Sequence, residues 1–206
     1  MAAFVCLVHY HEIGLKGNNR STFEHKLIDN LRATLKGLPV SSVERISGHL
    51  LVRLAPAADY DAAMTVYGRI RQTPGVARVS FARCCEVSSE QYCEAAYLEL
   101  AASGDFESFK VDSRRSNTNI ALNSLDLNRE VGSYLCERFP DKVVRMKGQD
   151  RTVHVYVIQG SVYVYVKTDE GVGGLPVGSA GKVISLLSSG IDSPVASWRM
   201  LRRGAI

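Results

Sequence analysis

The segment 188–193, Ser-Ser-Gly-Ile-Asp-Ser, has the residue types of an anion-binding turn. Small side chains, as in the first three residues of this run, let backbone N–H groups come close to a phosphate. The hydrophobic run 182–187 before it predicts a buried parallel strand, and Pro194 after it suits the first turn of a helix. A helix N-terminus adds partial positive charge there, so the pattern favours phosphate binding.

Two polar side chains of this turn have expected roles beyond its small-residue backbone. The Ser193 hydroxyl is expected to cap the following helix. The Asp192 carboxylate repels phosphate unless it holds the loop in shape, binds Mg²⁺ or pairs with a lysine further along the chain. An ordinary strand-to-helix turn of an α/β domain would use the same small residues, and at this point it remains the alternative.

Two further polar loops gather groups that can contact RNA phosphates and 2′-hydroxyls. The first loop carries Lys16, Asn19 and Arg20, and the second carries Arg114, Arg115, Asn117 and Asn119. A solvated surface loop is the alternative for each cluster. The two clusters together, on a chain that also holds a phosphate-type turn, favour nucleic-acid binding.

An α/β unit with the order β-α-β-β-α-β is predicted to position the first loop. Its elements are a strand over 4–10, a helix with Phe23, Leu27, Leu31 and Leu35 at helical spacing, strands over 42–46 and 49–54, a helix over 59–71 and a strand over 76–83. Ser47-Gly48 between the two middle strands is typical of a hairpin turn. This order is the ferredoxin-like repeat, a small antiparallel sheet with two helices on one face.

A second α/β unit is predicted to hold the second loop. Its elements are a helix after Ser88, a strand over 106–111, a helix over 126–138, a strand over 143–146 and a strand pair over 153–158 and 161–166 that turns at Gln159-Gly160. Tyr156, Tyr163 and Tyr165 lie at strand spacing. That spacing favours packing over base stacking.

The glycine-rich segment 171–178 contains one proline and predicts a linker to a third unit. That unit begins with the strand and the anion-binding turn, followed by a helix with Val195, Trp198 and Leu201 on its apolar side. A strand, a turn and a helix cannot bury a parallel sheet alone. The third domain is therefore expected to be incomplete in this chain.

The composition is that of a globular protein, with 206 residues, 46% of them apolar and 22% charged, and it argues against disorder or a collagen-like fibre. The net charge is +4, but acidic residues are concentrated in 84–107, where no Lys or Arg occurs. The remaining surface is therefore basic.

Five cysteines without a C-x-x-C pair predict reduced structural thiols rather than a disulfide framework or a zinc knuckle. Leu15 stands where an H-E-x-x-H zinc helix starting at His11 needs its second histidine, so no metal-ligand set is predicted. No apolar run approaches the length of a membrane span or completes a signal peptide. We expect a cytoplasmic protein with no membrane partner.

Two motifs resemble known families. Segment 188–193 resembles the S-G-G-x-D-S pyrophosphate loop (PP-loop) of ATP pyrophosphatases, with Ser189 in place of the second glycine. Segment 11–20, followed by Phe23, is similar to the E-I-x-L-K-G-x-N-R-x-x-F opening of tRNA 4-thiouridine synthetases, also called tRNA sulfurtransferases. Segments 109–115, 130–132 and 170–178 resemble the strand, helix and exit linker of the RNA-binding THUMP domain of that family.

The resemblance implies a mixed α/β (α+β) chain of three parts. These are a ferredoxin-like domain over 1–75, a THUMP domain over 76–174 that in the family starts near residue 60, and over 175–206 the linker and first strand, loop and helix of a PP-loop domain. It also implies that ATP is held by Leu186, Leu187, Ser188, Ser189, Gly190, Ile191, Asp192 and Ser193, with Mg²⁺, and that Lys16, Asn19, Arg20, Arg114, Arg115 and Asn117 contact tRNA.

The activity that the resemblance implies is formation of 4-thiouridine at tRNA position 8. The uridine is adenylated with ATP, and persulfide sulfur then displaces AMP. A cysteine desulfurase or another sulfur donor, a homodimer and a role in thiamine thiazole synthesis belong to the same expectation. The resemblance places the sulfur-carrying cysteine of the family beyond residue 206, so none of the five cysteines is assigned that role and the 206-residue chain is expected to be inactive. Another THUMP-containing RNA modifier, such as a methyltransferase, and a non-catalytic RNA-binding module remain alternatives.

Overall fold

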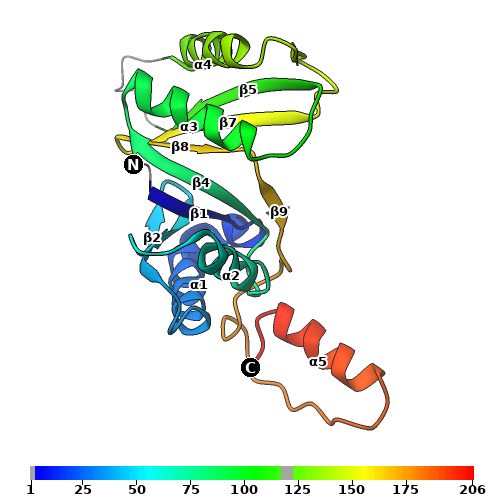
Figure 1. The fold of residues 1–206 in the computed structure, drawn as a ribbon. Coiled ribbons are helices and arrows are strands. Elements are labelled where there is room, and N and C mark those ends of the chain that lie inside the picture. Colours follow the sequence, from blue (N-terminus) through cyan, green and yellow to red (C-terminus); the bar gives the residue numbers. More distant parts are fainter. Residues whose placement is uncertain (1–2, 117–122) are drawn as a thin grey trace. The chain divides into compact units, whose positions relative to one another are not determined.

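The structure is a computed structural model that describes residues 3–116 and 123–206, and it divides into two compact units. One unit consists of residues 6–79 and 169–206, and the other consists of residues 80–168 with the N-terminal residues up to Val5 (Figure 1). Strands β1, Ala3–His9, and β4, Arg78–Glu86, carry residues of both units.

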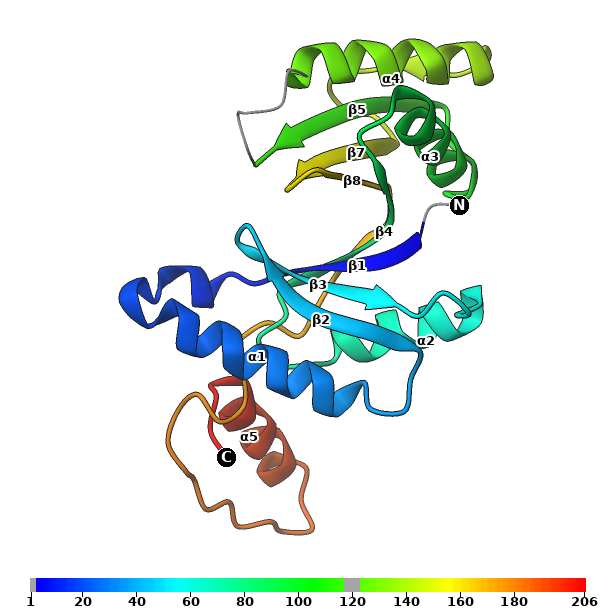
Figure 2. The ribbon, with the colours of Figure 1, turned by 90° about the vertical axis from the view of Figure 1, so that its left-hand side faces the viewer.

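The first unit has the ferredoxin-like fold that the sequence predicts. Between β1 and β4 it contains α1 (Arg20–Thr34), β2 (Val40–Ile46), β3 (His49–Leu54) and α2 (Tyr60–Arg71). The strands lie in the order β2-β3-β1-β4, and both helices cover one face of the sheet (Figure 2). Buried apolar side chains from the helices and the sheet, among them Leu27, Leu31, Leu51 and Ile70, form the core between these layers.

Local signals set the turns and caps of this unit. Ser47 and Gly48 have φ values of 30° and 83°, as the hairpin turn between β2 and β3 requires, so that prediction is confirmed. Asp59 caps α2, because its Oδ1 accepts a hydrogen bond of 2.7 Å from the Ala62 amide. The predicted loop before α1 contains two short 3₁₀ helices, Glu12–Leu15 and Gly17–Asn19.

One core position of α1 differs from the prediction. Phe23 is only half-buried, whereas the neighbouring Glu24 is buried with 2% of its surface exposed. Glu24, Leu27, Ile28 and Leu31 share the buried face of the helix at helical spacing. The buried face of α1 therefore includes the acidic side chain of Glu24, and Phe23 lies at the edge of that face.

The second unit consists of α3 (Ser89–Ala101), β5 (Ser108–Arg115), α4 (Ser124–Arg138), β6 (Val143–Val144), β7 (Arg151–Ile158) and β8 (Ser161–Tyr165). Strand β5 is parallel to β6 and β7, β8 is antiparallel to β7 and to β4, and the order is β4-β8-β7-β5-β6. Helices α3 and α4 cover the same face of this sheet (Figures 1 and 2). A three-residue strand that the sequence did not predict, β9 (Thr168–Glu170), pairs with β4.

The core of this unit lies between α3, α4 and the sheet. Leu100, Phe109, Leu127 and Leu135 are fully buried there. Of the three strand tyrosines, Tyr163 and Tyr165 are buried, as packing side chains should be, whereas Tyr156 is half-buried.

The five cysteines, all of which lie in the described part of the chain, form no disulfide. Burial raises the pKa of the Cys6 and Cys85 thiols to about 12 and that of Cys93 to about 11. These three thiols are therefore protonated packing groups, as predicted, whereas Cys84 is only half-buried and Cys136 is exposed. Within residues 3–116 and 123–206, no helix has the length and apolar character needed to cross a membrane.

A buried ion pair in the second unit predicts how the stability of the protein depends on pH. The Glu99 carboxylate on α3 lies 2.8 Å from Arg83 Nε on β4, and only 8% of its side-chain surface is exposed. Burial raises its pKa to about 7 despite the Arg83 charge. Between an unfolded pKa of about 4.3 and this value, the folded chain holds a proton that the unfolded chain has lost.

We therefore predict that the free energy of unfolding falls by on the order of 2 kcal/mol as pH rises from 4.5 to 7. Glu99→Gln should remove that dependence, whereas Glu90→Gln, at an exposed position on the same helix, should retain it. Urea unfolding of the three proteins across this pH range measures the effect. Parallel pH profiles for the wild type and the Glu99→Gln variant would contradict the prediction.

Candidate functional site

The candidate nucleotide loop directly precedes helix α5, Asp192–Arg202. The Ser188 amide donates a 2.9 Å hydrogen bond to Ser193 Oγ, and the Gly190 amide donates a 3.3 Å hydrogen bond to Ser188 Oγ. The prediction that Ser193 caps the helix is wrong, because the helix begins at Asp192, two residues before the predicted start, and its N-cap, Ile191, makes no side-chain cap bond. The Ser193 hydroxyl instead closes the loop on itself.

The predicted strand over 182–187 is not formed. Ile184 and Leu186 are 92% and 86% exposed, and the segment contains no strand residues. Within the described part of the chain, the backbone of this segment makes one backbone hydrogen bond, in which the Val183 amide donates to the Ile206 carbonyl at 2.9 Å. A parallel strand is stabilised by neighbouring strands, and the described residues supply none here. Val195, Trp198 and Leu201 on α5 are likewise between 36% and 45% exposed.

The glycine-rich segment 171–178 is a strap, bonded along its length, rather than a loose linker. On one side it exchanges backbone hydrogen bonds with the end of α2 and the start of β4: Gly171 N to Ala77 O, Val172 N to Arg71 O, Gly173 N to Val76 O and Gly75 N to Gly173 O. On the other side it bonds the end of α5: Leu175 N to Arg202 O and Gly178 N to Gly204 O. The strap therefore joins the helix that follows the nucleotide loop to the ferredoxin-like unit.

Two glycines let the strap pack closely against the backbone of the neighbouring segments. A Cβ on Gly171 would lie 2.4 Å from the Val76 carbonyl oxygen, and one on Gly174 would lie 2.2 Å from the Arg202 carbonyl oxygen. Gly174 also has a φ of 80°, which L side chains rarely adopt. Any other residue at these positions must displace backbone.

The first predicted RNA-binding cluster lies at the start of α1. The Lys16 ammonium lies 5.0 Å from the ring centroid of Phe23, and Asn19 is exposed just before the helix. Arg20 donates from Nε to Glu24 at 2.8 Å and from Nη2 to the Tyr10 hydroxyl at 2.7 Å, while 40% of its side chain stays exposed. The structure therefore brings the three predicted residues together but ties Arg20 to a buried partner.

The prediction that Arg114 and Arg115 lie in a loop is wrong, because strand β5 continues through Arg115 and the second cluster lies at the end of that strand. Arg114 is 70% exposed and its Nη2 lies 3.3 Å from Asp112 Oδ2, whereas Arg115 is half-buried. Asn117 and Asn119 lie outside the described residues.

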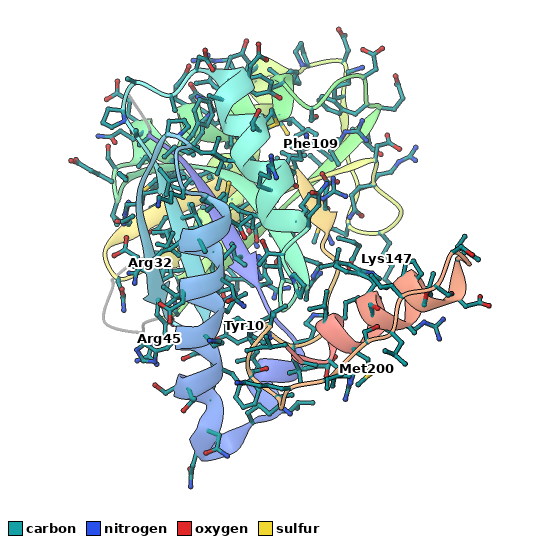
Figure 3. The ribbon with its side chains drawn as sticks, turned by 90° about the horizontal axis from the view of Figure 1, so that it is seen from below. Tyr10, Arg32, Arg45, Phe109, Lys147 and Met200 are labelled. Carbon is teal, nitrogen blue, oxygen red and sulfur yellow. The ribbon has the colours of Figure 1, made fainter. Side chains whose placement is uncertain are left out.

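Arg45 and Glu24 are the residues that sequence reasoning missed at the first cluster. Arg45 on β2 donates from Nη1 to Glu24 Oε2 at 2.8 Å, and Tyr10 and Arg45 both lie beside α1 (Figure 3). The sequence carried a signal for Glu24, because this glutamate stands three and seven positions before Leu27 and Leu31 and so lies on the same face of the helix. A buried carboxylate requires donors from elsewhere in the fold.

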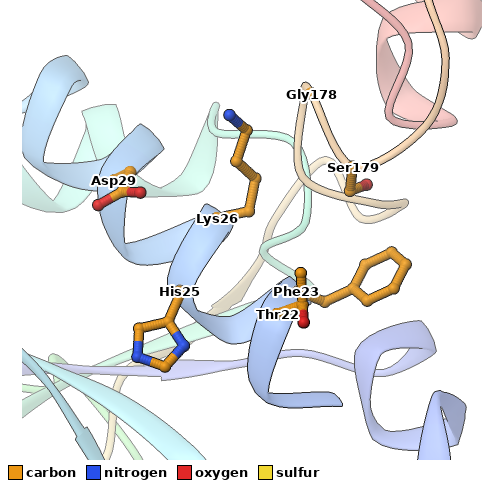
Figure 4. A pocket seen from close by; sticks show the side chains of 7 residues that line it. All are labelled: Thr22, Phe23, His25, Lys26, Asp29, Gly178 and Ser179. Atoms are coloured by element: carbon orange, nitrogen blue, oxygen red, sulfur yellow. The ribbon is translucent and has the colours of Figure 1, made fainter. Parts of the chain in front are cut away.

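An open cavity of about 520 Å³ lies between α1 and the strap (Figure 4). It is lined by Thr22, Phe23, His25, Lys26, Asp29, Gly178 and Ser179. Lys26 fills part of the space beside the strap, because a Cβ on Gly178 would lie 2.4 Å from Lys26 Cε. None of the predicted ATP-binding residues lines this cavity.

Comparison with protein families matches three consecutive segments of the chain. Residues 5–80 match the ThiI ferredoxin-like domain, residues 91–167 match the THUMP domain and residues 178–206 match the family described as thiamine biosynthesis protein (ThiI). The order of these matches along the chain is the order that the sequence motifs predict.

Relatives and solved structures agree with these matches. The chain is 36% identical over 198 residues to a probable tRNA sulfurtransferase of Moorella thermoacetica, and the match covers 96% of this chain and 49% of the relative. It is 32% identical over 204 residues to a probable tRNA sulfurtransferase of Coxiella burnetii, and that match covers 97% of this chain and 51% of the relative. It therefore spans about half the length of these curated relatives.

Two solved structures share the fold. A 4-thiouridine synthetase in complex with RNA and bound ATP superposes with a TM-score of 0.84 at 29% identity, covering 99% of this chain and 51% of that chain. The protein PH1313 of Pyrococcus horikoshii Ot3 superposes with a TM-score of 0.84 at 26% identity, covering 98% and 67%. The ferredoxin-like and THUMP domains that the sequence predicts are thereby confirmed.

The close packing of the strap yields a prediction. Gly174→Ala should lower the free energy of unfolding of the ferredoxin-like unit by about 1–3 kcal/mol, because the added Cβ clashes with backbone and φ is positive. Hydrogen exchange of the amides in segment 171–206 should accelerate more than that of β5 and β7. Gly181→Ala, where a Cβ meets nothing within 4 Å, is the matched control. Equal exchange rates in the two variants would contradict the conclusion that the strap holds α5 against the ferredoxin-like unit.

Proposed function

Because the chain belongs to the tRNA sulfurtransferase family, we propose that it provides the tRNA-binding and nucleotide-loop part of an ATP-dependent enzyme that forms 4-thiouridine at tRNA position 8. The observation that carries this proposal is the succession of ferredoxin-like, THUMP and ThiI segments, superposing on a 4-thiouridine synthetase that was solved with RNA and ATP. Transferase activity, cytoplasmic location, a homodimer and a role in thiamine synthesis form part of the same proposal.

In this function the two basic clusters hold the tRNA backbone. Lys16, Asn19 and Arg20 surround the start of α1, and Arg114 extends from the end of β5 beside Arg115. Guanidinium, ammonium and amide groups donate to phosphate oxygens and 2′-hydroxyls, contacts that position RNA without reading its sequence. The RNA would be selected by its folded shape.

The loop before α5 fits a phosphate group. The Ser188 and Gly190 amides already donate to serine hydroxyl oxygens within the loop, so a phosphate oxygen could replace those acceptors at the same amides. The exposed segment from Leu186 through Ile191 leaves room for the nucleotide, and α5 directs its N-terminus to the same place. ATP supplies the adenylyl group and leaves pyrophosphate, whose charge these amides would stabilise.

Asp192 is the one carboxylate of the loop. At the first position of α5 it is exposed, and it would hold Mg²⁺ or keep the loop in shape. The outer sulfur of a persulfide, supplied by a cysteine desulfurase or another donor, would then bond to C4 of the activated uridine and displace AMP. A second thiol would break the resulting S–S bond, so that 4-thiouridine leaves and the carrier sulfur ends in a disulfide with that thiol. The buried thiols of Cys6, Cys85 and Cys93 are unsuited to carry the persulfide, because burial holds them protonated.

The separate roles of the nucleotide loop and the tRNA-binding clusters can be tested in a protein that contains a complete PP-loop domain. Asp192→Ala should abolish 4-thiouridine formation and leave the tRNA dissociation constant within about twofold, because the carboxylate belongs to the nucleotide loop. Ser189→Gly, which restores the glycine of the family pattern, should be tolerated or improve ATP binding. Loss of tRNA binding in the Asp192 variant would contradict the separation of the nucleotide loop from the tRNA-binding residues. Intact turnover would show that Asp192 is not needed at the nucleotide site.

The RNA contacts can be tested with the 206-residue chain itself. If Lys16, Arg20, Arg114 and Arg115 neutralise about four phosphates, the log–log slope of tRNA affinity against salt should lie near −3 to −4. Arg114→Ala with Arg115→Ala should weaken binding and flatten the slope by up to about two units. Fluorescence anisotropy across a salt series measures both quantities. An unchanged affinity and slope would show that the end of β5 is an ordinary solvated surface.

A further inference from the structure

The buried Glu24 carboxylate joins two arginines from different elements. Arg20 on the first turn of α1 donates to Oε1 at 2.8 Å, and Arg45 near the end of β2 donates to Oε2 at 2.8 Å. The Tyr10 hydroxyl donates to Oε1 from the buried side. Because the two guanidinium groups take different oxygens of one carboxylate, they are held next to each other.

The charges of this cluster do not balance. One buried carboxylate faces two guanidinium groups whose side chains are 40% and 53% exposed, so one positive charge remains in excess at the surface. Burial raises the pKa of Glu24, but hydrogen bonds from Tyr10, Arg45 and Arg20 outweigh that effect and lower it, which keeps the carboxylate ionised. A guanidinium has five N–H donors, and the bonds to Glu24 and Tyr10 use one on Arg45 and two on Arg20.

The hairpin turn leaves room for the arginine pair. A Cβ on Gly48 would lie 3.2 Å from Arg20 Nη2, so the turn glycine allows the guanidinium to lie against the β2–β3 hairpin. The neighbouring His49 has its pKa lowered by burial and by the Arg20 charge, and it is neutral at pH 7. The outward edges of the two guanidinium groups are therefore the charged groups that the cluster presents.

We propose that Arg20 and Arg45 form a phosphate-binding pair for the RNA backbone, with Glu24 as its positioning residue. The inference rests on the proposed tRNA binding and adds Arg45, which lies 25 positions from Arg20 in the sequence, to the RNA-contacting surface. The planar fork of each guanidinium matches two phosphate oxygens, and its anchoring to a buried carboxylate fixes the fork before RNA arrives. A phosphate in front of the pair meets the excess positive charge.

The competing explanation is that the Arg20–Glu24–Arg45 contacts only stabilise the fold. Substitution of Arg45 distinguishes this explanation from phosphate binding. Arg45→Gln should weaken tRNA binding about 3- to 10-fold near 0.1 M salt and flatten the log–log salt slope by up to one unit. Arg45→Lys retains the charge but loses the fork, so binding should weaken about 2- to 5-fold with the slope unchanged. Arg129→Gln removes the same charge from an 81% exposed arginine on α4 and should change neither quantity.

Glu24→Gln gives a test of opposite sign. The variant chain carries one more positive charge, so long-range attraction alone would strengthen tRNA binding. Loss of the ionised anchor frees the two guanidinium groups, and the proposal therefore requires weaker binding. Because Glu24 is buried, urea unfolding must first show that the variant folds, and the Arg45 variants decide the question if it does not.

The measurement is fluorescence anisotropy of a labelled tRNA minihelix with the 206-residue chain and each variant across a salt series. Affinity and slope in Arg45→Gln that equal those of the Arg129→Gln control would overturn the proposal. If the wild-type chain binds and the Arg114 and Arg115 variants weaken binding, such a result leaves the proposed function intact. Absence of salt-dependent binding by the wild-type chain would overturn both.

Discussion

An ionised carboxylate inside an apolar core must be met by donors, and at Glu24 this requirement organises the basic side of the ferredoxin-like unit. Glu24 is buried together with Leu27 and Leu31, so its charge is balanced by hydrogen bonds from Arg45 on β2, Arg20 on the first turn of α1 and Tyr10, which follows β1. These bonds bring Arg20 and Arg45 to one carboxylate while 40% and 53% of their side-chain surfaces stay exposed. In the proposed function, a constraint of folding thereby creates a surface that binds phosphate.

The second constraint is the close approach of the glycine strap. It bonds the ferredoxin-like unit on one side and the end of α5 on the other, in contacts that leave no room for a Cβ at Gly171 or Gly174. The candidate nucleotide loop, which precedes α5, is therefore attached to the same compact unit that carries Arg20 and Arg45. In the proposed enzyme, one body would hold both the phosphates of the RNA and the start of the ATP site.

Features set by local chemistry could be predicted from the sequence, and features set by distant partners could not. The Ser47-Gly48 turn and the ferredoxin-like order follow from residue conformation and periodicity. Segment 182–187 has the composition of a buried strand but lacks neighbouring strands among the described residues, and β9 is too short to show a period. The Glu24 network joins residues up to 35 positions apart, from Tyr10 to Arg45, so only its buried member leaves a sequence signal.

The central claim is that the basic surfaces of this chain recognise folded RNA and are not general polyanion binders. Competition of a tRNA and of duplex DNA of equal charge for the 206-residue chain, measured by anisotropy at several salt concentrations, tests it most directly. Recognition by helix geometry, 2′-hydroxyls and exposed single-stranded ends predicts that the tRNA wins at every salt concentration. Equal competition by the two nucleic acids would contradict the account.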